Sequence, residues 1–420
     1  MRRTQGSPPR AYDELMRKTP FSILTKPTGA ACNLDCTYCF FLSKELLYNH
    51  EQRMSTATLR QYLASYLDSQ PDGEVTIAWQ GGEPTLRGLD FFREAVAVAK
   101  EVARPGQEPH HTIQTNATLI DDTWADFFAA ENFLVGVSID GPEEIHNTYR
   151  VNKAGRGTHA QVIDGYRTLQ QAGVEINILC TIHSANQNHP LDVYRYFREE
   201  LDARFIQFIP IVERVPHEDL AIAEQGWKTN NRERILYRQA GNAVTSRSVT
   251  PRAFGAFLCA IWDEWIKTDV GKVFVQHFDT ALANAFGVYS LCVHSPTCGL
   301  ALAVEHNGDV YSCDHYVEPG YLLGNVASDS LQHMVNSPVQ RQFGLAKAQL
   351  TKQCQQCPVR WACFGGCPKD RFSESTHGEY GQNYLCAGYL DFFQHITPEI
   401  QQMAQLIQQG REAAEIMTKA

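Results

Sequence analysis

Three cysteines are concentrated in the stretch ACNLDCTYCF, which covers residues 31–40. Cys32, Cys36 and Cys39 are separated by three and two residues, so their thiolates can surround one metal centre. This spacing is too tight and too isolated for a four-ligand zinc site, which usually takes two Cys or His pairs. His50 could complete a Cys3His site, but a [4Fe–4S] cluster fits the spacing better. Three ligands would leave one iron open to a cofactor or substrate, or to a dehydratase-like Lewis-acid role.

Eight more cysteines lie in the last third of the chain. Their spacing, in order, is Cys292-x5-Cys298-x14-Cys313, Cys354-x2-Cys357-x5-Cys363-x3-Cys367, and finally Cys386. Eight thiolates are enough for two complete four-ligand sites, and zinc ribbons are one alternative because a Cys-x2-Cys pair suits zinc. Cys180 lies in an apolar strand-like run and Cys259 on the apolar face of a helical pattern, so both are expected to be core residues.

The elements that must position the first cysteines alternate between strand-like and helix-like patterns. Strands are expected at 21–25, 74–79, 111–115, 133–139, 174–182 and 204–212. Helices are expected between them at 55–67, 89–103, 121–130, 159–172 and 190–201, the first with Ser55 as its N-cap. Strands that alternate with crossover helices predict a parallel sheet. The predicted fold class is therefore α/β, with six such units forming a partial (β/α)6 barrel.

In a β/α barrel, functional residues gather where the strands end. The three cysteines follow the first expected strand, and QGGEP (80–84) follows the second. NAT (116–118) follows the third strand and DGPEE (140–144) follows the fourth. We therefore expect these four segments to share one face of the barrel.

The second half of the chain has a different pattern. Helical periodicity dominates from about residue 230 to 290 and includes 256–266, whereas the chain from residue 291 onward is rich in Gly and Cys. A segment with so little apolar periodicity needs other stabilisation, for which metal is suited. Residues 398–417 have the pattern of a terminal amphipathic helix. The predicted organisation is a tail (1–20), a barrel (21–235), a helical connector (236–290), a Cys-rich domain (291–395) and a terminal helix (396–420).

Composition excludes several classes of protein. The 420 residues are 43% hydrophobic and 20% charged, with a formal net charge of −10. This charge argues against a basic surface for nucleic acid or anionic membrane. The sequence has no secretory signal and no apolar run long enough to span a bilayer, so a cytoplasmic protein is expected. In a reducing compartment, the thirteen cysteines are expected to be free thiols rather than disulfides, and the clustered ones are expected to bind metal.

The pattern C-x3-C-x-Y-C after the first strand of a β/α barrel resembles the radical S-adenosylmethionine (SAM) superfamily. Tyr38 matches the aromatic residue that usually precedes the third cysteine there. GGEP matches the motif whose backbone meets the SAM amino group, which places Gly82 and Glu83 at the cofactor. The resemblance implies that SAM chelates the open iron. One electron from the cluster then cleaves SAM to methionine and a 5′-deoxyadenosyl radical.

Three further positions match the cofactor site of that superfamily. Ser138 in VSIDG and Arg150 in HNTYR match residues that contact the SAM carboxylate or ribose in related enzymes. Val212, after the sixth expected strand, matches an apolar position beside the adenine.

The C-terminal cysteines resemble the SPASM domain, an iron–sulfur extension of radical SAM enzymes that modify peptides. That domain carries two auxiliary [4Fe–4S] clusters, so the resemblance implies three clusters in all, together with SAM. It assigns one cluster to Cys292, Cys298, Cys313 and Cys367, and the other to Cys354, Cys357, Cys363 and Cys386. Spacing alone would instead pair Cys363 with Cys367.

Nearly the whole chain resembles the anaerobic sulfatase-maturating enzymes, on the segments QGGEPTL, QTNATLI, SIDGPEEIHNTYR, FIPIVER and CDHYVEPGYLLGN. Such enzymes oxidise a Ser or Cys of a sulfatase, in a Cys/Ser-x-Pro/Ala-x-Arg motif, to Cα-formylglycine. The resemblance implies that Asp314 is the base and that Gln80 binds the substrate backbone. It also implies an electron donor such as a flavodoxin or ferredoxin. Phe41 stands where related maturases often have a tyrosine, so a phenol hydroxyl is missing there.

Three alternatives compete with this interpretation. The first is another SPASM peptide modifier that forms a thioether or crosslink, although such enzymes usually carry an N-terminal precursor-binding domain. The second is an iron–sulfur electron carrier or sensor, which would need neither an open iron nor a GGEP segment. The third is a zinc-stapled binding module, which visible absorbance after anaerobic purification would distinguish.

Overall fold

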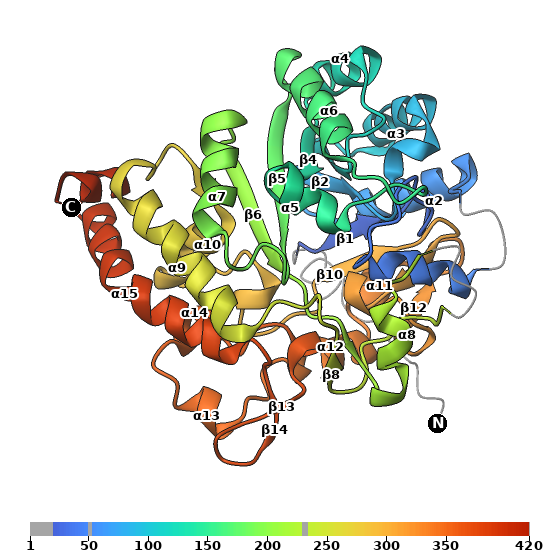
Figure 1. The fold of residues 1–420 in the computed structure, drawn as a ribbon. Helices are drawn as coiled ribbons and strands as arrows, with labels where there is room; N and C mark the ends of the chain where they lie inside the picture. The colour runs from blue at the N-terminus through green and yellow to red at the C-terminus, as the bar shows by residue number, and fades with distance from the viewer. Residues whose placement is uncertain (1–19, 49–52, 229–233, 420) are drawn as a thin grey trace, which may run out of the picture.

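The computed structural model describes residues 20–48, 53–228 and 234–419. His50 and nearly all of the expected N-terminal tail lie outside these residues. A ten-stranded sheet forms the centre of the molecule, in the order β12-β11-β10-β1-β2-β3-β4-β5-β6-β9 (Figure 1). None of the helices in the described segments is long and apolar enough to cross a membrane.

The six expected strands are present and follow one another in the sheet. They are Ser22–Thr25 (β1), Gly73–Trp79 (β2), Gln107–Thr115 (β3), Leu134–Ser138 (β4), Glu175–Ile182 (β5) and Phe205–Pro210 (β6). Each pairs in parallel with the next. The predicted partial barrel is therefore confirmed. The third strand begins four residues earlier than expected.

Crossover helices connect these strands and cover the outer face of the sheet (Figure 1). They are Thr56–Ser69 (α2), Leu89–Val102 (α3), Asp122–Ala130 (α4), Glu143–Tyr149 (α5), His159–Gln171 (α6) and Pro190–Arg195 (α7), with a π-helical turn at Tyr196–Glu200. In β2, the burial of alternate residues follows the two-residue period of a strand, with Val75, Ile77 and Trp79 buried. The Trp79 ring packs edge-on against Phe91 and Phe92 of α3, so this face of the sheet forms the core.

The C-terminal half extends the same sheet beyond β1. Strand β10 (Ala301–Val304) pairs in parallel with β1, and β11 (Asp309–Tyr311) and β12 (Leu322–Asn325) add antiparallel strands. At the other edge, β9 (Phe274–Val275) pairs with β6. The sequence did not predict these strands, which have two to four residues each and show no period; β1 is equally short but was recognisable from its apolar run.

The expected helical connector is only partly helical. Its helices are Pro251–Thr268 (α9) and Gln276–Ala285 (α10), whereas residues 234–250 contain only the short strand Ala243–Val244 (β8). Strand β8 pairs with Arg214–Val215 (β7). The remaining short helices in this half are Leu220–Glu224 (α8), Leu331–Val335 (α11), Pro338–Ala346 (α12), Lys352–Gln355 (α13) and Arg360–Cys363 (α14). A small hairpin is formed by Ser373–Glu374 (β13) and Tyr380–Gln382 (β14).

The terminal helix differs from the prediction of a helix over 398–417. Helix α15 spans Cys386–Gln408 with Pro398 in its interior, and a 3-10 segment follows at Ala413–Lys419. Its buried face, including Phe392, Ile396 and Ile400, packs along α9, so tertiary packing outweighs the hydrogen bond lost at Pro398. The two helices approach closely where a Cβ on Gly255 would lie 2.6 Å from the carbonyl oxygen of Gly388.

Ser55 is the N-cap of α2, as expected, and its Oγ accepts a hydrogen bond from the backbone N–H of Thr58 at 3.0 Å. The substitution S55A should lower the free energy of unfolding by about 1 kcal/mol, because this N–H loses its partner. Denaturant unfolding measures the change. Ser330, the exposed N-cap of α11, makes no such bond, so S330A is the matched control and should change stability much less. Equal losses in both variants would contradict the capping role.

Candidate active site and cysteine-rich loops

The segments after β1, β2 and β3 meet at the carboxyl ends of the strands. The Glu83 carboxylate is fully buried and accepts hydrogen bonds from the Thr115 hydroxyl at 2.8 Å and the Asn116 backbone N–H at 2.7 Å. Asn116 in turn donates to the Asn33 side chain at 2.9 Å, beside Cys32. The GGEP and NAT segments therefore share the face of the cysteine loop, as the barrel prediction required.

The two glycines of GGEP allow this segment to lie directly against the cysteine loop. The backbone N–H of Gly82 donates to the carbonyl of Gly29 at 2.9 Å, and that of Glu83 donates to the carbonyl of Ala31 at 2.9 Å. A Cβ on Gly82 would lie 2.1 Å from the Ala31 carbonyl oxygen. Only glycine fits this close approach.

Cys32, Cys36 and Cys39, the cysteine triplet, are free and lie close together after β1. Burial raises the pKa of the Cys36 thiol to about 12, with Arg150 acting in the opposite direction. Burial also raises the pKa of Cys32, and its neighbours Glu83, Cys36 and Cys39 add to the effect. Such crowded, buried thiols ionise readily only when a positive centre such as iron binds them. The donor set therefore fits an iron–sulfur cluster.

Asp140, which the sequence analysis did not single out, organises two of the predicted cofactor residues. Its Oδ2 accepts hydrogen bonds from the Tyr38 hydroxyl at 2.6 Å and from Arg150 Nε at 2.8 Å. Although burial opposes ionisation, Arg150 and the His183 ring lower the pKa of Asp140 below its usual range. The ionised carboxylate thus fixes the Arg150 guanidinium beside the Tyr38 ring. Its position after β4 was the only signal in the sequence.

The other predicted contact residues lie at the ends of their own strands. Ser138 ends β4, and its Oγ accepts a hydrogen bond from the Gln114 side chain at 3.0 Å. Val212 is buried, and the residue before it is pinned by backbone bonds to Ile182 and Val249. Gln80 is half-buried after β2. Within the described residues, no hydrogen bond joins Ser138 or Val212 to the cysteine loop.

Asp314 is brought to the end of β1 by an ion pair that the sequence analysis missed. Its Oδ1 lies 2.8 Å from the Nζ of Lys26, and Lys26 also lies 3.3 Å from Glu305 Oε1. Burial lowers the pKa of Lys26, but the two carboxylates outweigh it and the net change is upward, so the ammonium is charged. Asp314 therefore joins the loop of Cys313 to the segment between β1 and the cysteine triplet. The clue in the sequence was a lysine directly after the first strand.

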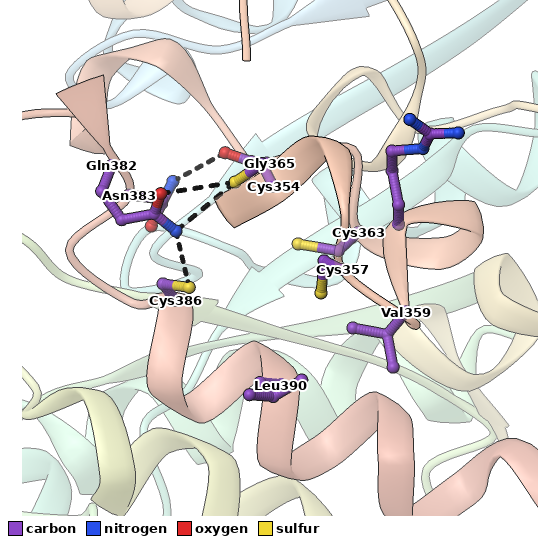
Figure 2. Close-up of a pocket in the computed structure, with 10 residues that line it drawn as sticks. Cys354, Cys357, Val359, Cys363, Gly365, Gln382, Asn383, Cys386 and Leu390 are labelled. Atoms are coloured by element: carbon purple, nitrogen blue, oxygen red, sulfur yellow. Dashed lines mark hydrogen bonds between the residues drawn. The ribbon is translucent and has the colours of Figure 1, made fainter. Parts of the chain in front are cut away.

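Cys354, Cys357, Cys363 and Cys386, the second cysteine set, line one cavity, and Figure 2 shows their sulfur atoms pointing into the same space. Gln382 Nε2 donates to Cys386 Sγ at 2.7 Å and to Cys354 Sγ at 3.4 Å. Burial raises the pKa of the Cys363 thiol to about 12. Four buried or half-buried thiols that face one space are suited to binding a cluster and are not typical of an apolar core.

Cys292, Cys298, Cys313 and Cys367 form the first cysteine set. Burial raises the pKa of Cys313, and the nearby thiols of Cys367 and Cys292 add to the effect. Burial likewise raises the pKa of Cys298, to which Cys292 contributes. Lys347 lies among them, and burial lowers its pKa to about 8. This arrangement also provides thiol donors for a cluster. In the described part of the chain, no three His, Cys, Asp or Glu side chains are arranged around a single metal ion.

The turn between Cys363 and Cys367 explains why these two neighbours belong to different sets. Phe364, Gly365 and Gly366 all have positive φ values, of 47°, 72° and 62°. Three left-handed residues in succession reverse the chain, and Arg371 donates to the carbonyl oxygens of this turn. Cysteine spacing does not reveal such a reversal.

Cys180 is fully buried in β5, as expected of a core residue. Cys259 is only partly buried and packs against the core from α9.

Comparison with known proteins agrees with this arrangement. Residues 27–197 match the Radical SAM superfamily, and residues 297–358 match SPASM, an iron–sulfur cluster-binding domain. A solved structure of native anSMEcpe with bound AdoMet and Cp18Cys peptide aligns with a TM-score of 0.77 at 30% identity, covering 92% of this chain and 99% of that chain. Streptococcus suis SuiB bound to precursor peptide SuiA shares the fold, with a TM-score of 0.59 at 15% identity over 90% of this chain and 78% of that one. The fold and the cysteine loops define a radical SAM enzyme with a C-terminal SPASM domain.

Curated relatives narrow this class. A serine-type anaerobic sulfatase-maturating enzyme of Bacteroides thetaiotaomicron is 43% identical, covering 95% of this chain and 94% of that protein. A cysteine-type enzyme of Clostridium perfringens is 31% identical, covering 91% and 97%. The chain belongs to the family of anaerobic sulfatase-maturating enzymes, which confirms the resemblance inferred from its motifs.

The substitution G82A should disturb the cysteine loop, because the added Cβ would overlap the Ala31 carbonyl. Overpacking of this kind costs about 1–3 kcal/mol of stability. Less iron should be retained after anaerobic reconstitution. Iron content and thermal unfolding measure both effects. Gly320 has open space around its Cβ position, so G320A is the matched control. Unchanged iron in G82A would contradict the close approach.

Proposed function

We propose that this enzyme oxidises an active-site Ser or Cys of a sulfatase polypeptide to Cα-formylglycine. The observation that carries the proposal is Asp314, a carboxylate held by Lys26 at the end of β1, on the segment that leads to the cysteine triplet. The names of the serine-type and cysteine-type relatives support the same client. The target residue would lie in a Cys/Ser-x-Pro/Ala-x-Arg segment.

The cysteine triplet would hold the cluster that binds SAM. The backbone of Gly82 and Glu83 would meet the SAM amino group, with Ser138 and Arg150 near its carboxylate or ribose. Tyr38 would pack beside the cluster, and Val212 would pack beside the adenine. The first and second cysteine sets would each hold an auxiliary [4Fe–4S] cluster, giving three in all. Asp140 supports this assignment because it orients the Arg150 guanidinium through an ion pair at 2.8 Å.

When bound, SAM and the three clusters supply a radical that removes a hydrogen atom and an acceptor for one electron. The protein must supply the group that accepts the remaining proton and the groups that hold the peptide. Conversion of the primary alcohol of serine to an aldehyde removes one hydrogen atom from Cβ, one proton from the hydroxyl and one electron. The Asp314 carboxylate would take the proton, since an ionised Asp within reach is a general base. The Gln80 side chain would hold the peptide backbone. A flavodoxin or ferredoxin would deliver the electron that starts each cycle.

Mass spectrometry of synthetic peptides tests the proposal directly. Reconstituted enzyme, SAM and a strong reductant should remove two hydrogens from a Ser-motif peptide under anaerobic conditions. A Cys-motif peptide should also lose two hydrogens, and its thioaldehyde should then exchange sulfur for oxygen with water and release hydrogen sulfide. The triple variant C32A/C36A/C39A is the control and should form no deoxyadenosine. Unchanged peptides in the presence of deoxyadenosine would refute the proposed client and favour another peptide modification, such as a thioether.

The substitution D314N should separate SAM cleavage from product formation. An amide cannot accept the proton, so aldehyde formed per deoxyadenosine should fall at least about a hundredfold, the scale of general-base catalysis. Deoxyadenosine should still form because Asp314 is not among the residues proposed to bind SAM. Quantifying both products in one reaction measures the ratio. An unchanged ratio would remove Asp314 as the base.

A further inference from the structure

Lys26 is a fully buried lysine whose ammonium contacts three groups at the centre of the molecule. Its Nζ lies 2.8 Å from Asp314 Oδ1, 3.3 Å from Glu305 Oε1 and 4.1 Å from the centre of the Phe41 ring. A buried charge needs compensating charges close by. Glu305 and Asp314 supply them for Lys26, whose Nζ makes no hydrogen bond among the described residues.

Strand register explains why these groups meet. Thr25 pairs with Val304 in the parallel β1–β10 ladder, and the Lys26 backbone N–H donates to the Val304 carbonyl at 2.9 Å. Glu305, the next residue after Val304, is thereby placed beside Lys26. Strand β11 returns antiparallel to β10 and leads through Cys313 to Asp314.

The two carboxylates around Lys26 differ in a way that indicates their roles. The Glu305 side chain is 2% exposed, whereas that of Asp314 is 12% exposed. Glu305 alone could neutralise the Lys26 ammonium. Charge neutralisation therefore does not explain why Asp314 also lies beside it. Asp314 presents Oδ1 to Lys26 in the ion pair, and among the described residues no hydrogen bond reaches either of its carboxylate oxygens. One oxygen is therefore anchored and the other is left available.

We propose that Lys26 is a positioning residue for Asp314: it holds Oδ1 so that Oδ2 faces the substrate hydroxyl or thiol and receives its proton. This inference rests on the proposed function. The Phe41 ring contributes a face against which the ammonium lies, so a phenol hydroxyl is not needed for this contact. Glu305 balances the charge of Lys26 and does not touch the substrate.

The test compares two variants whose difference is Lys26. E305Q keeps the Lys26–Asp314 pair, whereas K26M/E305Q removes the cation. The double variant removes one positive and one negative charge, so the local net charge equals that of the wild type. K26M alone would leave two buried carboxylates without a cation and is more prone to misfold. Iron content and thermal unfolding are recorded for each protein.

Positioning and structural roles predict different kinetics. With the Ser-motif peptide, K26M/E305Q should form deoxyadenosine at the wild-type rate but at least about tenfold less aldehyde per deoxyadenosine, a fraction of the general-base contribution. The peptide KM should be unchanged, because Lys26 is fully buried and contacts Asp314 rather than the peptide in this proposal, and E305Q should keep the wild-type ratio. A purely structural role would instead lower iron content and SAM cleavage in parallel.

Each other result counts against the inference. A wild-type ratio of aldehyde to deoxyadenosine in K26M/E305Q would overturn the inference. An equal fall of this ratio in E305Q and in the double variant would also overturn it. Loss of iron or of deoxyadenosine formation in the double variant would assign Lys26 to the structure instead. If the wild-type enzyme makes deoxyadenosine but no aldehyde, the proposed function fails and the role of Lys26 fails with it. These outcomes are distinguishable because the wild type is measured first.

Discussion

The parallel pairing of β1 with β10 joins the two cysteine-bearing parts of the chain in one sheet. Strand β1 leads into the cysteine triplet, and β10 with its neighbour β11 leads to Cys313. The loop after β1 and the loop after β10 emerge at the same end of the sheet, and β11 then runs back antiparallel to β10 toward Cys313. The buried Lys26 then connects them through its two carboxylate partners. The chain beyond residue 290 is therefore part of the wall of the barrel site.

Buried charge is the recurring means by which this site is ordered. Glu83, Asp140 and Lys26 are each fully buried, and each is held by partners from different strand ends. Glu83 binds the segment after β3, Asp140 binds Arg150 and Tyr38, and Lys26 binds the region after β10. Removing a partner from such a pair costs more than the pair contributes, so these contacts favour one arrangement of the loops.

The sequence predicted the first half of the fold well because its strands and helices are long enough to show their periods. The cysteine triplet, GGEP and the positions after the strands were also recognisable. The short strands β9 to β12 were not, and Pro398 was misread as the start of a helix because packing against α9 is not visible locally. Lys26 and Asp140 were missed because their importance comes from partners distant in the chain. The division of Cys363 and Cys367 between two sets depends on backbone conformation.

The left-handed turn at Phe364–Gly366 has a consequence for assembly of the protein. Cys363 and Cys367 lie on either side of this turn. The second cysteine set therefore contains the residue before the turn, and the first set contains the residue after it. Both sets depend on the conformation of this turn, which Arg371 stabilises by donating hydrogen bonds to its carbonyl oxygens. The arrangement of the two thiol sets is thereby coupled through one turn of the backbone.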